Sequence, residues 1–202
     1  MRIKIDRLSK AFDSLSVLDD ITFDVEPGQV IALLGANGAG KTTLLRLLAG
    51  ILVPCRGEIY YDSRPFRRDR IDLRRRLMFM PGLPAVFPGT SIIRHIGMVL
   101  RLNEQAGIGM EDKVIELLRE FDILPLAETM LRSLSRGESY KGALVALLAV
   151  NRGRTVIYST QILEVAEQFS DRVCILHNDR IAAFYQGSRT ASGRGSRPCT
   201  LG

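Results

Sequence analysis

Residues 35–43 carry the chemistry that stands out in this chain. They read Gly-Ala-Asn-Gly-Ala-Gly-Lys-Thr-Thr and match the phosphate-binding pattern G-x-x-x-x-G-K-[ST] in full. Successive backbone N–H groups of such a loop face an anion from the positive end of a helix, along a path that glycine permits. The Lys41 ammonium is expected to reach the terminal phosphates of a nucleotide, and the Thr42 hydroxyl to bind a phosphate-bound Mg2+ ion. The predicted nucleotide-binding residues are Gly35, Ala36, Asn37, Gly38, Ala39, Gly40, Lys41, Thr42 and Thr43.

The residues on either side predict a strand-to-helix turn at this loop. Val30–Leu34 has the length and composition of a buried parallel strand, and leucines recur at helical spacing after Thr43. A plain glycine turn before an amphipathic helix would account for the glycines. It would not account for Lys41 and Thr42 at the required positions, so phosphate binding is the better interpretation.

The rest of the first eighty residues is rich in predicted strands. Polar and apolar residues alternate around Ile3–Ile5 and along Ile21–Val25, and short apolar runs at Gly57–Tyr61 and Leu77–Met80 end in turn residues. Phe12 is an aromatic residue in the polar stretch between the first two strands. Its ring is expected either to stack on an adenine base or to plug the edge of the core.

The middle of the chain predicts a helical subdomain over about residues 88–150. Apolar residues recur at helical spacing from Ile92 to Leu100 and from Val114 to Phe121. The segment Leu134–Glu138 then leads directly into the apolar helix pattern of Ala143–Val150, so a second helix N-terminus carries Ser and Gly.

Downstream of this subdomain the pattern returns to strands. Residues 155–160 read as a strand, residues 162–169 as a helix face, and residues 173–176 and 181–185 as two strands that flank a turn. Residues 187–202 are rich in Gly, Ser and Arg without periodicity, and a flexible tail is expected there.

Composition limits the classes of function. With 46% hydrophobic and 25% charged residues, the 202-residue chain fits one soluble domain with a sizeable core. The longest apolar run, Ala143–Val150, is far short of a membrane span, and the N-terminus has no apolar signal-peptide core, so a cytoplasmic protein is expected.

The three cysteines lack metal-ligand spacing. His95 and His177 are far apart in sequence and are expected to be satisfied or solvated.

The net charge of +6 and the arginines between residues 64 and 76 raise the question of an anionic partner. Interleaved aromatic residues and a recognisable nucleic-acid module are missing from the sequence, so a solvated arginine-rich face is favoured over nucleic-acid binding. No serine hydrolase is indicated either, because Lys141 stands where the G-x-S-x-G pattern needs its second glycine.

The phosphate loop, the helical insert and Leu-Ser-x-Gly at a helix start together resemble the ATP-binding subunit of ABC transporters, over residues 1–186. The resemblance implies an α/β fold: a P-loop NTPase core with a mostly parallel sheet, an N-terminal antiparallel β subdomain and an inserted helical subdomain. It implies ATP and Mg2+ as ligands and Phe12 as the adenine-stacking residue. The family's signature loop is usually Leu-Ser-Gly-Gly-Gln, and here Ser135 and Gly137 match while Arg136 and Glu138 depart from it.

Family subunits pair head to tail, so the resemblance implies a homodimer or heterodimer in which residues 135–138 face the partner's ATP. It also implies a separate transmembrane permease as a partner and a cytoplasmic location, peripheral on the inner face of the cell membrane.

The chain departs from the family where the family's hydrolytic residues are expected. The strand that ends in Asp-Glu, with the loop after it (the Walker B and D-loop segment), is missing near residue 151. The switch position holds Gln161 instead of His, and Gly82 stands where the family often has a Gln that contacts magnesium. No catalytic residue is therefore assigned.

Three alternatives remain open on the sequence. The chain is a transporter subunit that couples ATP to transport, a degenerate nucleotide-binding module or inactive half-site with little hydrolysis, or a defective product of a once complete ancestor. The loss of a strand also leaves two ways to pair Val156–Ser159: with Val30–Leu34, the family position, or with Leu77–Met80. We expect the family position, because the following helix and strands hold it there.

Overall fold

The N-terminal alternation builds a long hairpin in the computed structural model, which describes residues 1–67, 69–74, 89–102, 109–150 and 154–188. Strand β1 (Ile3–Phe12) pairs antiparallel with β2 (Leu15–Val25) up to the pair of Phe12 and Leu15. Asp13, with φ 52°, forms the turn. The strands are therefore longer than predicted, and Phe12 lies in the hairpin and not between two separate strands.

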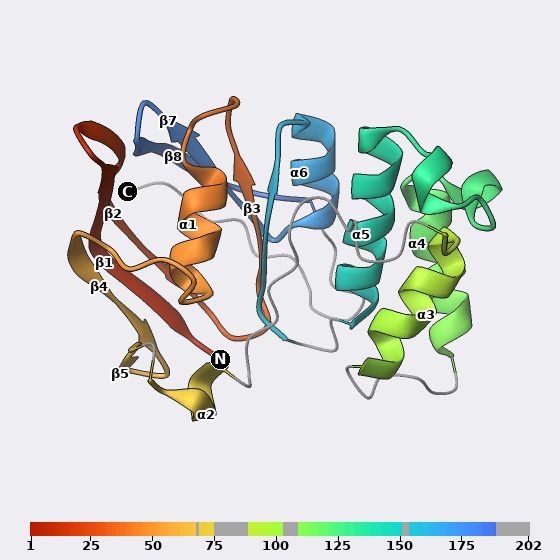
Figure 1. The fold of residues 1–202 in the computed structure, drawn as a ribbon, viewed down its shortest axis with the longest axis horizontal. Coiled ribbons are helices and arrows are strands. Elements are labelled where there is room, and N and C mark those ends of the chain that lie inside the picture. The colour runs from red at the N-terminus through yellow and green to blue at the C-terminus, as the bar shows by residue number, and fades with distance from the viewer. Residues whose placement is uncertain (68, 75–88, 103–108, 151–153, 189–202) are drawn as a thin grey trace. The chain divides into compact units, whose positions relative to one another are not determined.

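The chain divides into two compact units, one of residues 1–77 with 157–202 and one of residues 78–156. In the first unit the hairpin belongs to an antiparallel sheet of order β2-β1-β4-β5, with β4 at Arg56–Tyr61 and β5 at Arg64–Pro65 (Figure 1). This confirms the predicted antiparallel N-terminal sheet. Helix α2 spans Ile71–Arg74. The predicted strand at 77–80 and Gly82 lie outside the described residues.

A second sheet of order β6-β3-β7-β8 carries the phosphate loop. Strand β3 (Val30–Leu34) is almost wholly buried and pairs in parallel with β7 (Arg172–His177), which pairs antiparallel with β8 (Arg180–Gln186). Helix α1 (Lys41–Leu48) follows β3 directly. The predicted strand-to-helix context of the loop is confirmed.

Strand β6 (Val156–Thr160) lies beside β3. This confirms the expected pairing with Val30–Leu34. Helix α6 (Leu163–Phe169) follows β6 and contacts β3, as expected for a strand that its own helix holds in place. Gln161 follows β6, and the phosphate loop follows the neighbouring strand β3 of the same sheet.

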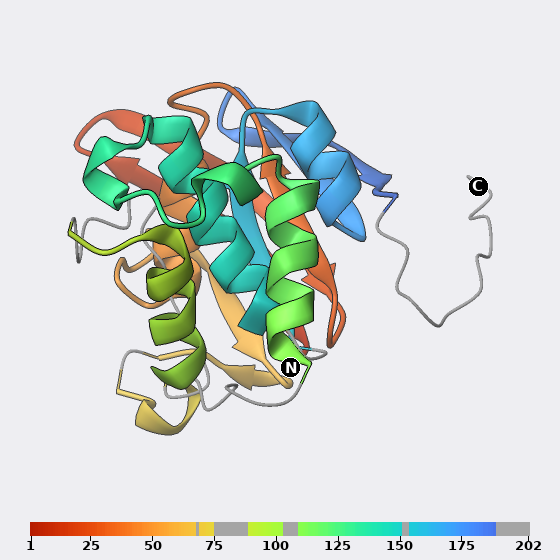
Figure 2. The same ribbon diagram turned by 90° about the vertical axis from the view of Figure 1, so that its right-hand side faces the viewer.

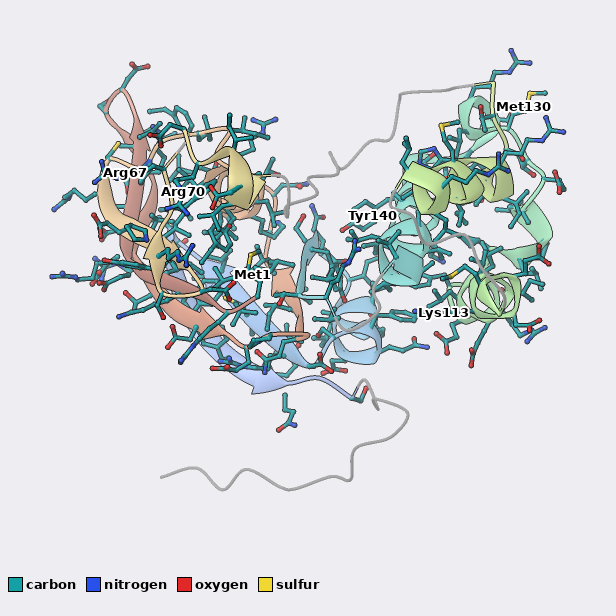
Figure 3. The ribbon with its side chains drawn as sticks, turned by 90° about the horizontal axis from the view of Figure 1, so that it is seen from below. Met1, Arg67, Arg70, Lys113, Met130 and Tyr140 are labelled. Atoms are coloured by element: carbon teal, nitrogen blue, oxygen red, sulfur yellow. The ribbon has the colours of Figure 1, made fainter. Side chains whose placement is uncertain are left out.

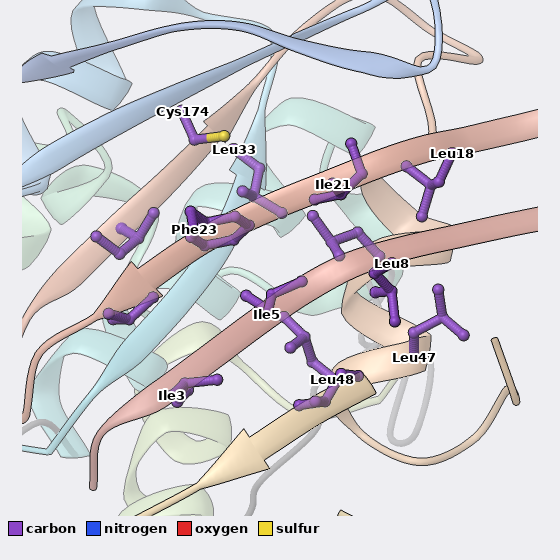
Figure 4. Close-up of a cluster of buried hydrophobic side chains, with 14 of the residues drawn as sticks. Ile3, Ile5, Leu8, Leu18, Ile21, Phe23, Leu33, Leu47, Leu48 and Cys174 are labelled. Atoms are coloured by element: carbon purple, nitrogen blue, oxygen red, sulfur yellow. The ribbon is translucent and has the colours of Figure 1, made fainter. Parts of the chain in front are cut away.

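One apolar cluster joins both sheets of this unit to α1. Buried side chains from β1, β2, β3 and α1 meet in it, among them Ile5, Ile21, Leu33 and Leu47 (Figure 4). Each of these four is at most 1% exposed. Because a close-packed interior does not deform easily, the cluster gives the loop a rigid base.

The second unit is helical, as predicted. Its helices are α3 (Ile92–Leu102), α4 (Met110–Glu120) and α5 (Arg136–Val150), and α5 contacts both of the others (Figure 2). Short 3-10 turns at Leu124–Leu126 and Leu131–Ser133 lead into α5.

His95 on α3 corrects one prediction. Its side chain is 6% exposed, and neither ring nitrogen has a hydrogen-bond partner within the described structure, so this histidine is neither solvated nor satisfied. Burial lowers the pKa of the imidazole, which keeps it neutral. The apolar residues around it in the helix pattern gave no sign of a missing partner.

Part of the arginine-rich segment is visible at the surface. Figure 3 labels Arg67, which is exposed, and Arg70, which is half-buried and directly precedes α2. The Arg70 guanidinium donates two hydrogen bonds to Asp72, at 2.9 and 2.7 Å, and thereby lowers the pKa of that carboxyl to about 2. Of the helices described, none has the length and apolar character that crossing a membrane requires.

Candidate functional site

The phosphate loop packs closely against β7 and β2, and glycine at two of its positions permits this close approach. A Cβ on Gly35 would lie 2.5 Å from the carbonyl oxygen of Leu176 in β7. A Cβ on Gly40 would lie 2.6 Å from the Val17 carbonyl oxygen and 2.7 Å from Leu18 Cδ2 in β2. Neither position has room for a side chain, so the close approach of the loop to both strands requires glycine at residues 35 and 40.

The loop leaves the N-terminus of α1 open to an anion. The N-cap residue Gly40 has φ 90° and ψ −2°, and no side chain makes a capping hydrogen bond there. Residues 36–38 and Thr42 are exposed. Because the first N–H groups of a helix have no partner within the helix, they are free to donate to a bound phosphate.

Lys41 is held against the loop by two backbone carbonyl oxygens. Its side chain is among the buried polar groups, and its ammonium donates hydrogen bonds of 2.7 Å to the carbonyl oxygens of Gly35 and Ala36. Burial lowers the pKa of Lys41 from its ordinary value. Neutral carbonyl oxygens are weaker partners for an ammonium than phosphate oxygens, so a bound phosphate would compete for it effectively.

Phe12 presents its ring to solvent at the end of β1. The side chain is 44% exposed and is not part of the buried cluster. The Lys10 ammonium lies over the ring at 5.1 Å from its centroid. This exposure is unlike that of a core residue, and an aromatic face open to a partner is what stacking on a base requires.

Gln161 contacts the phosphate loop directly. Its side-chain amide donates a hydrogen bond to the side-chain carbonyl oxygen of Asn37. Gln161 also lines a pocket of about 560 Å3 together with Gly35, Ala36 and His177. The structure thus brings Gln161 and the phosphate loop together.

Residues 135–138 lie at the start of α5 in the helical unit. Ser135 Oγ accepts a hydrogen bond of 3.2 Å from the Glu138 backbone N–H, and the Glu138 carboxylate accepts one of 2.7 Å from the Ser135 backbone N–H. This is a capping box, in which two unpaired helix donors are satisfied reciprocally. The S-x-x-E spacing of Ser135 and Glu138 is the signal for this capping box in the sequence.

A P-loop between a buried parallel strand and a helix, with its lysine and threonine in place, defines a nucleotide-binding protein of the P-loop class. A family model described as "ABC transporter" matches residues 18–156, and the chain belongs to this family.

Two of its relatives are bacterial proteins. The ABC-type transporter ATP-binding protein EcsA of Bacillus subtilis is 25% identical over 211 residues, which cover 90% of this chain and 85% of that protein. The sulfate/thiosulfate import ATP-binding protein CysA of Xanthomonas campestris is 30% identical over 216 residues, which cover 90% of this chain but 63% of that protein.

A solved structure of an ATP-binding subunit of an ABC transporter has a TM-score of 0.62 at 25% identity, with 92% of this chain and 90% of that chain covered. The chain therefore has the fold of the family's ATP-binding subunits, as the resemblance implies.

Proposed function

We propose that this chain is the ATP-binding component of an ABC transporter and that it acts together with a separate membrane permease. The observation that carries the proposal is the phosphate loop at residues 35–43, which combines a full motif match with an uncapped helix N-terminus. Both relatives reported above are named as ATP-binding proteins of transporters or import systems.

The residues present fit an ATP molecule with its Mg2+ ion. The backbone N–H groups of residues 36–42 and the Lys41 ammonium would hold the phosphates, and Phe12 would support the base. The Thr42 hydroxyl is exposed at the N-terminus of α1 and would bind the ion. Described residues contain no cluster of three His, Cys, Asp or Glu side chains that could hold a metal, so the remaining ligands would come from phosphate oxygens and water.

We propose in addition that two such subunits pair and that Ser135, Arg136, Gly137 and Glu138 face the partner's nucleotide. The subunit would lie at the inner face of the membrane through its permease. The capping box supports part of this, because it places the Ser135 hydroxyl at the start of α5 in a defined position.

Hydrolysis by this chain alone is expected to be slow. Helix α5 ends at Val150 and β6 begins at Val156, and the five residues between them include no carboxylate. Strand β6 ends at Thr160 and is followed by Gln161, and neither residue carries a carboxylate that could orient the attacking water. Because a positioned base or electrostatic group contributes orders of magnitude to a rate, its loss favours a subunit that binds ATP with little turnover.

Steady-state phosphate release, measured beside a nucleotide-binding titration, tests both parts of this proposal. The account expects saturable ATP binding that Lys41→Ala weakens strongly, with phosphate release far below about 1 per second, the lower end of ordinary enzyme turnover. Turnover at or above that rate, lost in Lys41→Ala, would show that another acid supplies the missing group.

A further inference from the structure

The two strands that the phosphate loop contacts belong to different sheets. The loop meets β7 at the Leu176 carbonyl and β2 at the Val17 carbonyl, where Gly35 and Gly40 have no room for a Cβ. Strand β2 lies in the antiparallel sheet, and β7 lies in the sheet that carries the loop. In the sheets that the structure describes, β2 and β7 therefore share no ladder of backbone hydrogen bonds. The spacing of the two loop contacts must depend on other interactions between these strands.

Two hydrogen bonds join β2 to the β7–β8 turn close to the loop contacts. The backbone N–H of Asp19 in β2 donates to the carbonyl oxygen of Asp179, in the turn between β7 and β8, at 2.8 Å. The guanidinium of Arg180, the first residue of β8, donates to the Asp19 carboxylate at 2.5 Å. Asp19 lies two residues beyond Val17, and Asp179 lies three residues beyond Leu176. Both hydrogen bonds are therefore made beside the positions that the loop contacts.

The Arg180 guanidinium lies among three carboxylates. Its hydrogen bond to Asp19 raises the pKa of Arg180, and the charges of Asp179 and Asp20 add to this effect. Asp19 and Asp20 belong to β2, whereas Asp179 lies in the turn before β8, so without the guanidinium like charges would face each other across the two segments. The Arg180 side chain is 68% exposed and that of Asp19 is 33% exposed, so water screens the pair and its effect is modest.

We propose that the ion pair of Asp19 and Arg180 positions the phosphate loop for nucleotide binding, because it holds β2 and the β7–β8 turn together beside the loop. The inference rests on the proposed nucleotide binding. Neither side chain touches the nucleotide in this account. The pair acts through the backbone of Val17 and Leu176, against which the two loop glycines pack. Asp19 and Arg180 are thus positioning residues.

Replacing the guanidinium should weaken nucleotide binding in proportion to the charge that is lost. Arg180→Ala leaves the carboxylates of Asp19 and Asp179 without the cation between them and should raise the Kd for Mg-ATP by about two- to fivefold, the range of an exposed ion pair. Arg180→Lys keeps the positive charge and should raise the Kd by less. Asp19→Asn keeps a hydrogen-bond acceptor and relieves the repulsion, so its effect should also be smaller than that of Arg180→Ala.

The experiment is a calorimetric titration of the full chain with Mg-ATP at about 0.1 M and about 1 M salt, between which the Debye length falls from about 10 Å to about 3 Å. The Kd of each variant is divided by that of the wild type at the same salt concentration, which cancels the direct effect of salt on ATP. Arg2→Ala is the matched control. Arg2 forms an exposed ion pair with Glu26 at 3.3 Å, beyond the end of β2 that is remote from Val17, so the Kd should not change.

A Kd ratio that rises in Arg180→Ala, rises less in Arg180→Lys and shrinks at high salt would support the inference. An equal loss of affinity in Arg2→Ala, or a loss in Arg180→Ala that is the same at both salt concentrations, would show a general structural effect and overturn it. Wild-type affinity in Arg180→Ala would overturn the inference alone. A wild type that binds no Mg-ATP would overturn the proposed function as well, so the two failures are distinguishable.

Discussion

Ser135 and Glu138 cap the N-terminus of α5 reciprocally, because the side chain of each accepts a hydrogen bond from the backbone N–H of the other. The Ser135 hydroxyl accepts from the Glu138 N–H at 3.2 Å, and the Glu138 carboxylate accepts from the Ser135 N–H at 2.7 Å. The hydrogen bonds from Ser135 lower the pKa of the Glu138 carboxyl, which keeps it ionised at the positive end of α5. Glu138, a departure from the usual Gln of the family's signature loop, therefore has a structural role here, because either residue can complete a capping box.

Ser135→Ala is expected to lower the free energy of unfolding by about 1 kcal/mol, because the Glu138 N–H loses its acceptor. Urea denaturation followed by far-UV circular dichroism measures the change. Ser139→Ala is the matched control, since Ser139 lies one turn inside α5 and alanine is the better helix former there. An equal loss in both variants would contradict the capping role.

The acid sensitivity of the helical unit is expected to depend on His95. The folded state keeps the imidazole neutral because burial lowers its pKa, whereas in the unfolded chain it takes up a proton near pH 6.5. The unfolded state therefore binds more protons below that pH, so stability is full above about pH 6.5 and decreases as the pH falls below it. Denaturation midpoints between pH 7.5 and about 5 measure this slope.

His95→Leu should reduce this slope. His177→Asn, at the exposed last position of β7, should retain the part of the slope that His95 produces. If the slope is the same in wild type and His95→Leu, the buried histidine is not its source.

Gly40→Ala is expected to destabilise the first unit by about 2 kcal/mol and to weaken nucleotide binding, because the new Cβ meets β2 and the backbone has φ 90°. Thermal unfolding with and without Mg-ATP measures both effects. Gly97→Ala in α3 is the contrast, since a Cβ there has open space and a helical alanine stabilises. Wild-type stability and affinity in Gly40→Ala would show that the loop does not need this close approach.

Local patterns in the sequence were enough to predict the phosphate loop and the strands and helices around it. The motif at residues 35–43, the apolar run of β3 and the helical spacing in α3 and α4 each depend on neighbouring residues only. The turn at Asp13 was missed because a left-handed backbone at one residue leaves no mark in the polar and apolar alternation. Phe12 was therefore placed outside the strand that holds it.

Contacts between residues that are distant in sequence could not be predicted, because local patterns depend on neighbouring residues only. The Gln161–Asn37 bond depends on how the turn after β6 meets the phosphate loop, and the orphaned ring of His95 depends on which side chains surround it. The placement of β6 beside β3 was predicted correctly, because the helix and strands that follow β6 restrict where it can pair. The roles of Phe12 and of residues 135–138 in nucleotide binding remain predictions.

Equilibrium binding of Mg-ATP to the wild type and to Lys41→Ala tests the central claim most directly. We expect saturable binding by the wild type, with about 4 kcal/mol of added stability when ATP is present at a thousand times its Kd. Lys41→Ala should lose most of this gain, whereas Lys4→Ala, which removes an exposed lysine over the Tyr60 ring, should keep it. A melting temperature of the wild type that does not move at saturating Mg-ATP would contradict the account.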